Sequence, residues 1–186
     1  MIFDIFVALL LGTGVMRLVE LGISWRRMLA RPDDVVSEPW MFPLMAGLHT
    51  GLVFLPILEV MLLHRHAYIG VFWVAIGVLL AATGLRIWTL STIGKSWNVR
   101  VVAPPPGGVA TIGPYAWIRH PNYLVVILEI AALPMVHGAW LSALCLSALN
   151  AFVLFHRIRT EEAVLMNNPV WAEAFRDKAR LVPGLL

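Results

Sequence analysis

Long apolar segments, separated by shorter polar ones, make up most of the sequence. Crossing a bilayer as a helix takes about 20 apolar residues. Three segments meet this requirement over nearly their whole length: residues 2–25, 41–63 and 67–91. The pattern therefore predicts at least three transmembrane helices.

A fourth apolar stretch, residues 122–156, carries a single charge and is interrupted near its middle by Pro134 and Gly138. Proline followed closely by glycine marks a turn. We therefore expect two shorter helices, 122–137 and 139–156. The whole chain is predicted to be one all-α integral membrane domain, residues 1–186, with about five transmembrane helices, the last two forming a helical hairpin.

The basic residues predict an orientation, because cytoplasmic loops retain Lys and Arg. With five alternating spans, one side receives eleven of these residues and the other side only Arg65. This places the long loop 92–121 and the helical tail 157–186 together in the cytosol. No cleavable signal is expected, since Arg17 and Glu20 interrupt the first apolar stretch.

Composition agrees with a membrane protein and narrows the partners. The chain is 60% hydrophobic and 13% charged, whereas a soluble domain is roughly a quarter charged. Its net charge of +3 comes from residues scattered among apolar segments, so no nucleic-acid partner is expected. The single Cys145 cannot form a disulfide framework or a cysteine metal site within this chain, and no metal is predicted.

The loop 92–121 is long for a connection between helices, and such loops are either functional or disordered. Its proline and glycine runs suit a flexible linker, but Trp97, Tyr115 and Trp117 would be poorly placed in water. We favour an ordered loop on the membrane face.

The loop ends in "AWIRHPNY", which predicts the start of a helix at Pro121. The free N–H groups of this helix end, beside Arg119 and His120, would attract a carboxylate or phosphate. Alternatively, Arg119 and His120 only anchor the helix at the interface, with Trp117 and Tyr115 in an aromatic belt. These residues alone favour neither interpretation.

A second polar group lies in "NAFVLFHRIRTEEAVL". On a helix Asn150, Arg157 and Glu161 share one face. The pairs Arg157–Glu161 and Arg159–Glu162 could be ordinary solvated pairs. Placed opposite the Arg-His helix start, they would instead complete a bipolar pocket suited to a zwitterionic ligand.

The predicted spans contain ionisable residues, which are costly at membrane depth and normally face one another or a cavity. They are Arg17, Glu20, His49, Glu59, Arg86 and Glu129. Arg17 and Glu20 can neutralise each other three residues apart, while Glu59 and Arg86 lie near span ends, where snorkelling is easy. The other two, His49 and Glu129, either line a buried cavity or hold helices together.

Taken together, "GPYAWIRHPNY", the helical hairpin and "RIRTEEAVL" resemble the isoprenylcysteine carboxyl methyltransferase superfamily of membrane methyltransferases. "RLVELGIS", "GKSW" and "RHPNYLVVILEIAALP" are most similar to a bacterial branch that O-methylates alkylpyrones and alkylresorcinols. The resemblance implies a bacterial cytoplasmic membrane and a cytosolic S-adenosylmethionine site. The cofactor-binding residues it implies are Arg119, His120, Pro121, Tyr123, Glu161 and Glu162.

The resemblance also implies a lipophilic acceptor taken from among the membrane lipids. A phenolic acceptor would need a base from Glu129, His49 or His120, and Arg157 or Arg86 would hold the acceptor oxygen. The prenylcysteine branch commonly has glycine soon after the tyrosine of this motif, whereas Tyr123 is followed by Leu124, Val125 and Val126. This difference disfavours a prenylcysteine acceptor.

One feature of the tail departs from the family, and other functions stay open. The tail lacks the family's usual aromatic pair, which argues against a role in closing the cofactor site. Carboxyl methylation of isoprenylcysteine and a non-enzymatic membrane interaction protein stay as alternatives. A transporter is disfavoured because the sequence has no internal repeat.

Overall fold

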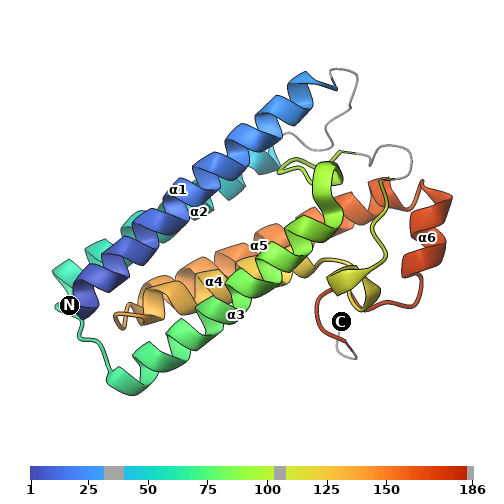
Figure 1. The fold of residues 1–186 in the computed structure, drawn as a ribbon. Coiled ribbons are helices and arrows are strands. Elements are labelled where there is room, and N and C mark those ends of the chain that lie inside the picture. The colour runs from blue at the N-terminus through green and yellow to red at the C-terminus, as the bar shows by residue number, and fades with distance from the viewer. Residues whose placement is uncertain (32–39, 103–107, 184–186) are drawn as a thin grey trace.

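The computed structural model describes residues 1–31, 40–102 and 108–183. Five long helices form a bundle, and a short sixth helix packs at the end of the bundle where the loop and the tail meet (Figure 1). The helices are α1 (Ile2–Leu29), α2 (Met41–Leu62), α3 (Ile69–Ile93), α4 (Pro121–Met135), α5 (Trp140–Leu165) and α6 (Pro169–Phe175), with short 3-10 helices η1 (Gly94–Ser96) and η2 (Gly113–Ala116) in the loop. Ile118 and Ala179 form an isolated parallel bridge between loop and tail.

Four of the helices in the described ranges, α1, α2, α3 and α5, are long and apolar enough to cross a membrane. The chain is therefore a membrane protein. Helix α4 has 15 residues, about 22 Å at 1.5 Å per residue, which is shorter than a hydrocarbon core of about 30 Å. Helix α5 does not end with its apolar segment at residue 156 but continues to Leu165, because the residues that follow are mostly strong helix formers.

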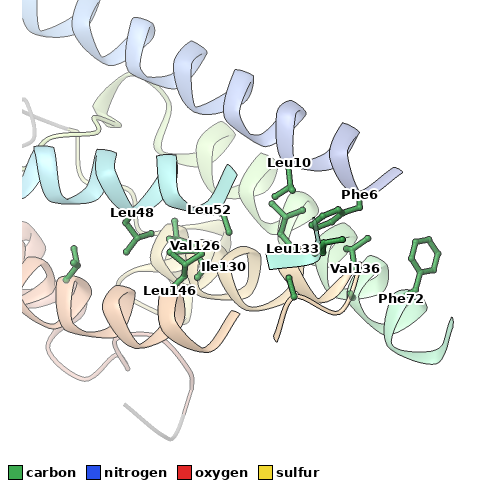
Figure 2. Close-up of a cluster of buried hydrophobic side chains, with 14 residues drawn as sticks. Phe6, Leu10, Leu48, Leu52, Phe72, Val126, Ile130, Leu133, Val136 and Leu146 are labelled. Atoms are coloured by element: carbon green, nitrogen blue, oxygen red, sulfur yellow. The ribbon is translucent and has the colours of Figure 1, made fainter. Parts of the chain in front are cut away.

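Helix α4 lies inside the bundle, between α3 and α5 (Figure 1). Nine of its 15 residues are buried, and its Val126, Ile130 and Leu133 form the core with residues of α1, α2 and α5 (Figure 2). Helix α1 differs, because only four of its 28 residues are buried. It presents most of its apolar surface outward, as a helix in contact with lipid does.

Glu59, near the end of α2, holds the start of α5. Its carboxylate accepts hydrogen bonds from the backbone N–H groups of Leu141 at 3.2 Å and Ser142 at 2.6 Å, and it pairs with Arg65 at 3.1 Å. The side chain therefore satisfies a helix N-terminus rather than snorkelling to water. The snorkelling interpretation is wrong for this residue.

The predicted tight turn between α4 and α5 is confirmed. Gly138 has a φ of 74°, in the left-handed region that disfavours side chains with a Cβ. A Cβ at this position would also lie 2.6 Å from the carbonyl oxygen of His66. The turn therefore needs glycine both for its backbone conformation and for its close approach to the α2–α3 connection.

Replacing Gly138 by alanine should destabilise the protein by about 2 kcal/mol or more, since a left-handed alanine is strained and the clash is with backbone. Thermal unfolding in detergent measures the effect. Gly84→Ala is the matched control, because a Cβ added to Gly84 on α3 would meet nothing within 4 Å. Equal unfolding midpoints for the two variants would contradict this account of the turn.

Candidate active site

A cavity of about 540 Å³ runs from the loop and tail into the bundle. Its polar end is lined by the loop, α4, α5 and α6, and its apolar end lies between α1 and α2. The residues named below for the polar end are Tyr115, Arg119, His120, Asn122, Tyr123, Arg157, Glu161, Trp171 and Phe175. Those of the apolar end include Leu11, Val15, Leu18, Val53 and Phe54.

Side chains of α1 fix the described part of the loop beside this cavity. The guanidinium of Arg27 donates to the carbonyl oxygens of Gly94 at 3.1 Å and Trp97 at 2.5 Å. Ser24 donates to the side-chain oxygen of Asn98 at 2.6 Å. The expectation of an ordered loop is thus confirmed for residues 94–98.

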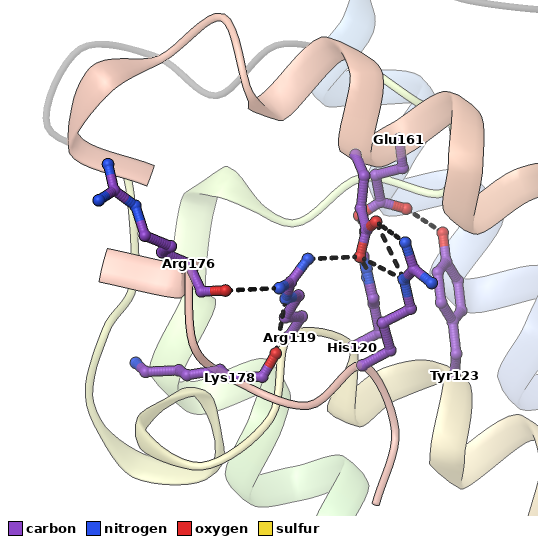
Figure 3. A network of polar contacts seen from close by, with 8 residues as sticks. Arg119, His120, Tyr123, Glu161, Arg176 and Lys178 are labelled. Carbon is purple, nitrogen blue, oxygen red and sulfur yellow. Dashed lines mark hydrogen bonds and ion pairs between the residues drawn. The ribbon is translucent and has the colours of Figure 1, made fainter. Parts of the chain in front are cut away.

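Arg157, Tyr123 and Glu161 form the central contact of the polar end. Arg157 Nε donates to the hydroxyl of Tyr123 at 2.7 Å, and that hydroxyl donates to Glu161 (Figure 3). The ring of His120 stacks on Tyr123 with centroids 5.3 Å apart. Helices α4 and α5 therefore present a cation, a phenol and a carboxylate to one cavity.

Arg157 also links this group to the loop and to α2. It donates to the carbonyl oxygen of Val99 and lies 2.6 Å from the sulfur of Met45. Its side chain is buried, whereas that of Glu161 is 27% exposed. The pair is therefore not a solvated surface pair. Glu161 lines the cavity, and its second carboxylate oxygen lies 3.8 Å from Nδ1 of His120.

Glu162, the neighbour of Glu161, faces the tail. It accepts from Arg119 at 3.2 Å, from His120 at 3.2 Å and from Arg180 at 2.8 Å, and this pairing raises the pKa of Arg180. It does not line the cavity. Its place in the structure is a junction that holds the tail against α4.

Arg119 belongs to the same junction, although it also lines the cavity. Its nitrogen atoms donate to the backbone oxygens of Lys178 at 2.8 Å and Arg176 at 3.0 Å, as well as to Glu162 (Figure 3). Pro121 begins α4 and is fully buried. The structure thus brings the predicted cofactor residues together, with Glu161, His120, Tyr123 and Arg119 at the cavity and Glu162 and Pro121 behind it.

Helix α6 supplies an aromatic pair that the sequence did not reveal. Trp171 and Phe175 stack with ring centroids 4.9 Å apart and pack on Tyr115 of the loop, whose burial raises the pKa of its phenol. All three line the cavity. We expected the tail to have no role in closing the cofactor site. The structure shows that the tail forms part of the cavity wall, since both rings lie four residues apart on a helix that Asn168 caps.

Asn122 is a further residue of this end that sequence reasoning missed. It lines the cavity, and its side-chain oxygen is buried with no hydrogen-bond partner in the described structure. The available signal was its place in "RHPNY", which we interpreted only as a helix start. A buried amide oxygen without a partner is costly, so this atom is a candidate acceptor for a ligand donor.

Four charged side chains form a network inside the bundle. Glu20 binds Arg17 at 2.7 Å and also pairs with Arg86, while Glu129 binds Arg86 at 3.0 Å and also pairs with Arg17. The predicted pairing of Arg17 with Glu20 is confirmed. The snorkelling interpretation of Arg86 is wrong, since its side chain is only 3% exposed and both its partners are carboxylates.

Glu129 and His49, the other two ionisable residues expected at membrane depth, have different surroundings in the structure. Glu129 serves the network and does not line the cavity, whereas His49 lies on the cavity wall. Arg17 and Glu20 line it as well, between the polar and apolar ends. Arg86 does not, so it has no access to a molecule in the cavity.

Comparison with known proteins relates the chain to a family of membrane methyltransferases. The model of the isoprenylcysteine carboxyl methyltransferase family matches residues 73–167. Over 130 residues the chain is 33% identical to the uncharacterized protein YpbQ of Bacillus subtilis (strain 168), a match that covers 69% of this chain and 76% of that protein. The family match spans α3, the loop, α4 and α5, which carry most of the polar end.

The charge network predicts that mutations within it have non-additive effects on the free energy of unfolding. Arg86→Met alone or Glu129→Met alone leaves an uncompensated buried charge, which typically costs about 3–5 kcal/mol. The double variant keeps the Arg17–Glu20 pair and a balanced charge, so its free energy of unfolding should fall less than the sum of the single losses. Denaturant unfolding of the three variants measures this, and strictly additive losses would show that the four charges do not act as one network.

Proposed function

Because the chain belongs to the isoprenylcysteine carboxyl methyltransferase family, we propose that it is an S-adenosylmethionine-dependent O-methyltransferase of lipophilic acceptors. The supporting observation is a continuous cavity, which joins a polar, aromatic end to an apolar groove between α1 and α2. We propose alkylpyrones or alkylresorcinols as acceptors. The polar end and the C-terminus are assigned to the cytosol of a bacterial cell, in keeping with the distribution of basic residues.

The polar end fits the donor chemically. S-adenosylmethionine carries hydrogen-bond donors on its ammonium, ribose and adenine, and Glu161 and the unpartnered oxygen of Asn122 are acceptors at this end. Arg119 is a cation for its carboxylate. Tyr115 and Trp171 offer aromatic faces to the adenine ring or the sulfonium.

The apolar end fits a lipid that enters sideways. Leu11, Val15, Leu18 and Phe54 line the cavity and are also 52%, 61%, 69% and 59% exposed. The cavity therefore opens between α1 and α2 on a surface that lipid covers. An alkyl chain could enter there without leaving an apolar environment, which favours it by about 0.8 kcal/mol per methylene over transfer through water.

The protein's task in this reaction is alignment and exclusion of water. The donor supplies a methyl group activated on a sulfonium, and attack by an anionic oxygen neutralises charge, so a dry, oriented site favours transfer. Arg157 contacts Tyr123 at the polar end and Met45 on α2. We assign it the role of orienting the acceptor oxygen toward the donor site.

The first prediction concerns the donor. The purified protein should bind S-adenosylmethionine and its demethylated product, and Glu161→Gln should weaken binding about 10- to 100-fold, the loss expected for one charged hydrogen bond. Calorimetry in detergent measures both values. Glu173→Gln, on the exposed surface of α6, is the control and should bind normally. If the wild-type protein and the Glu173→Gln control both give no binding heat at millimolar donor, the proposed function is contradicted.

The second prediction concerns the acceptor. A long-chain alkylpyrone or alkylresorcinol should be methylated faster than a farnesylcysteine at equal concentration with labelled donor. Transfer should also rise with chain length, because each added methylene favours partition of the acceptor from water into the membrane, from which it enters the apolar end, by about 0.8 kcal/mol. Faster transfer to farnesylcysteine would favour the carboxyl-methylating alternative, and indifference to chain length would contradict lateral entry.

A further inference from the structure

His49 of α2 occupies an unusual position on the cavity wall. Its Nδ1 lies 2.9 Å from the backbone oxygen of Met45, one turn earlier in the same helix. A carbonyl oxygen can only accept, so Nδ1 must carry the ring proton. In the neutral imidazole the second nitrogen, Nε2, is then a bare lone pair that can accept a proton.

This lone pair has no hydrogen-bond partner among the described residues. Nε2 is buried and receives no hydrogen bond there, although the ring lines the cavity. Since Nδ1 faces its own helix, Nε2 is on the side of the ring turned away from it. Buried polar atoms without partners are rare and costly in native structures, which points to a ligand group that donates to this atom.

The other candidate bases are already engaged. Nε2 of His120 lies 3.2 Å from the Glu162 carboxylate, and Glu129 is paired with both Arg17 and Arg86. Glu129 also does not line the cavity. The other ring nitrogen of His120, Nδ1, lies 3.8 Å from the Glu161 carboxylate, so both of its nitrogens face carboxylates. Of the three residues, His49 is the one that lines the cavity with a buried ring nitrogen that has no partner among the described residues.

Arg17 supplies the complementary group from α1. Its two terminal nitrogens bind Glu20 and Glu129, which leaves Nε buried and without a partner in the described residues. Arg17 and His49 line the same cavity from neighbouring helices. The wall thus offers one N–H donor and one lone pair. A hydroxyl group satisfies both, because it donates and accepts. A carboxylate has no proton to donate and satisfies only the first.

We propose that His49 is the general base for an acceptor that arrives as a neutral, weakly acidic hydroxyl, with Arg17 binding its oxygen. This rests on the proposed function. The acceptor O–H bond breaks and its proton moves to His49 Nε2. The oxygen electron pair forms the bond to the methyl carbon of the sulfonium donor, and the carbon–sulfur bond breaks with its electrons remaining on sulfur as a neutral thioether.

The inference selects among acceptor classes. A long-chain resorcinol keeps its proton at neutral pH and needs a base, whereas a hydroxypyrone enol or a carboxylate is already largely ionised. Loss of the base should therefore lower turnover more for a weakly acidic acceptor than for an acidic one. A residue that merely supported the cavity would affect all acceptors alike.

The test compares His49→Gln with wild type in lipid nanodiscs, using a resorcinol and a hydroxypyrone with the same alkyl chain. The turnover number with the resorcinol should fall about 100-fold, in the range typical of a lost general base, and that with the hydroxypyrone should fall far less. His156→Gln is the matched control, because His156 lies on α5 against Phe152 and Phe155 and does not line the cavity. It should leave both activities near wild type.

Donor affinity, measured alongside, shows whether His49→Gln keeps its fold. If that affinity is lost, His49→Ala with added imidazole decides, because imidazole should restore transfer to the resorcinol selectively. Equal losses for both acceptors, or no loss, overturn the inference while leaving the proposed function intact. Failure of the wild type to methylate either acceptor overturns the proposed function and this inference with it.

Discussion

Charges buried among membrane helices must be paired, and this constraint determines how the bundle is assembled. Arg17 and Glu20 of α1 meet Arg86 of α3 and Glu129 of α4, and each carboxylate contacts both guanidinium groups. In an apolar medium an unpaired member of this set would be far more costly than in water. Helix α1 buries four of its 28 residues, and this network joins it to α3 and α4 beside the core contacts of Phe6 and Leu10.

The position of α1 in turn creates the cavity. The family match begins at residue 73, so α1 and α2, which form the apolar end, lie outside it. The polar end is built by the matched segment and completed by α6, which the Glu162 junction holds in place through the tail. Under the proposed function the donor would bind the end built by the matched segment, and the acceptor would contact mainly α1 and α2, which the family model does not cover. This division would let members of one family accept different lipids.

The sequence predicted the features that are determined within a single helix or turn. Apolar length located the helices, and Pro134 and Gly138 located the turn between α4 and α5, where the structure shows a left-handed Gly138. What depends on neighbouring helices could not be predicted, because periodicity gives the face of a helix but not its partner. Glu161 and Glu162 illustrate this, since adjacent residues point about 100° apart and only the packing shows that the first meets the cavity and the second the tail. The partners of Arg86 and the packing of the α6 aromatic pair on Tyr115 were missed for the same reason.

The central claim is that one continuous cavity holds the donor at its polar end and a lipid chain between α1 and α2. It is tested most directly by photo-crosslinking with an analogue of the demethylated donor whose sulfur carries a long alkyl chain ending in a diazirine. The account predicts crosslinks to residues of the apolar end, such as Val15 and Phe54, which excess unmodified donor product abolishes. Competed crosslinks that map only to the loop or tail would contradict it.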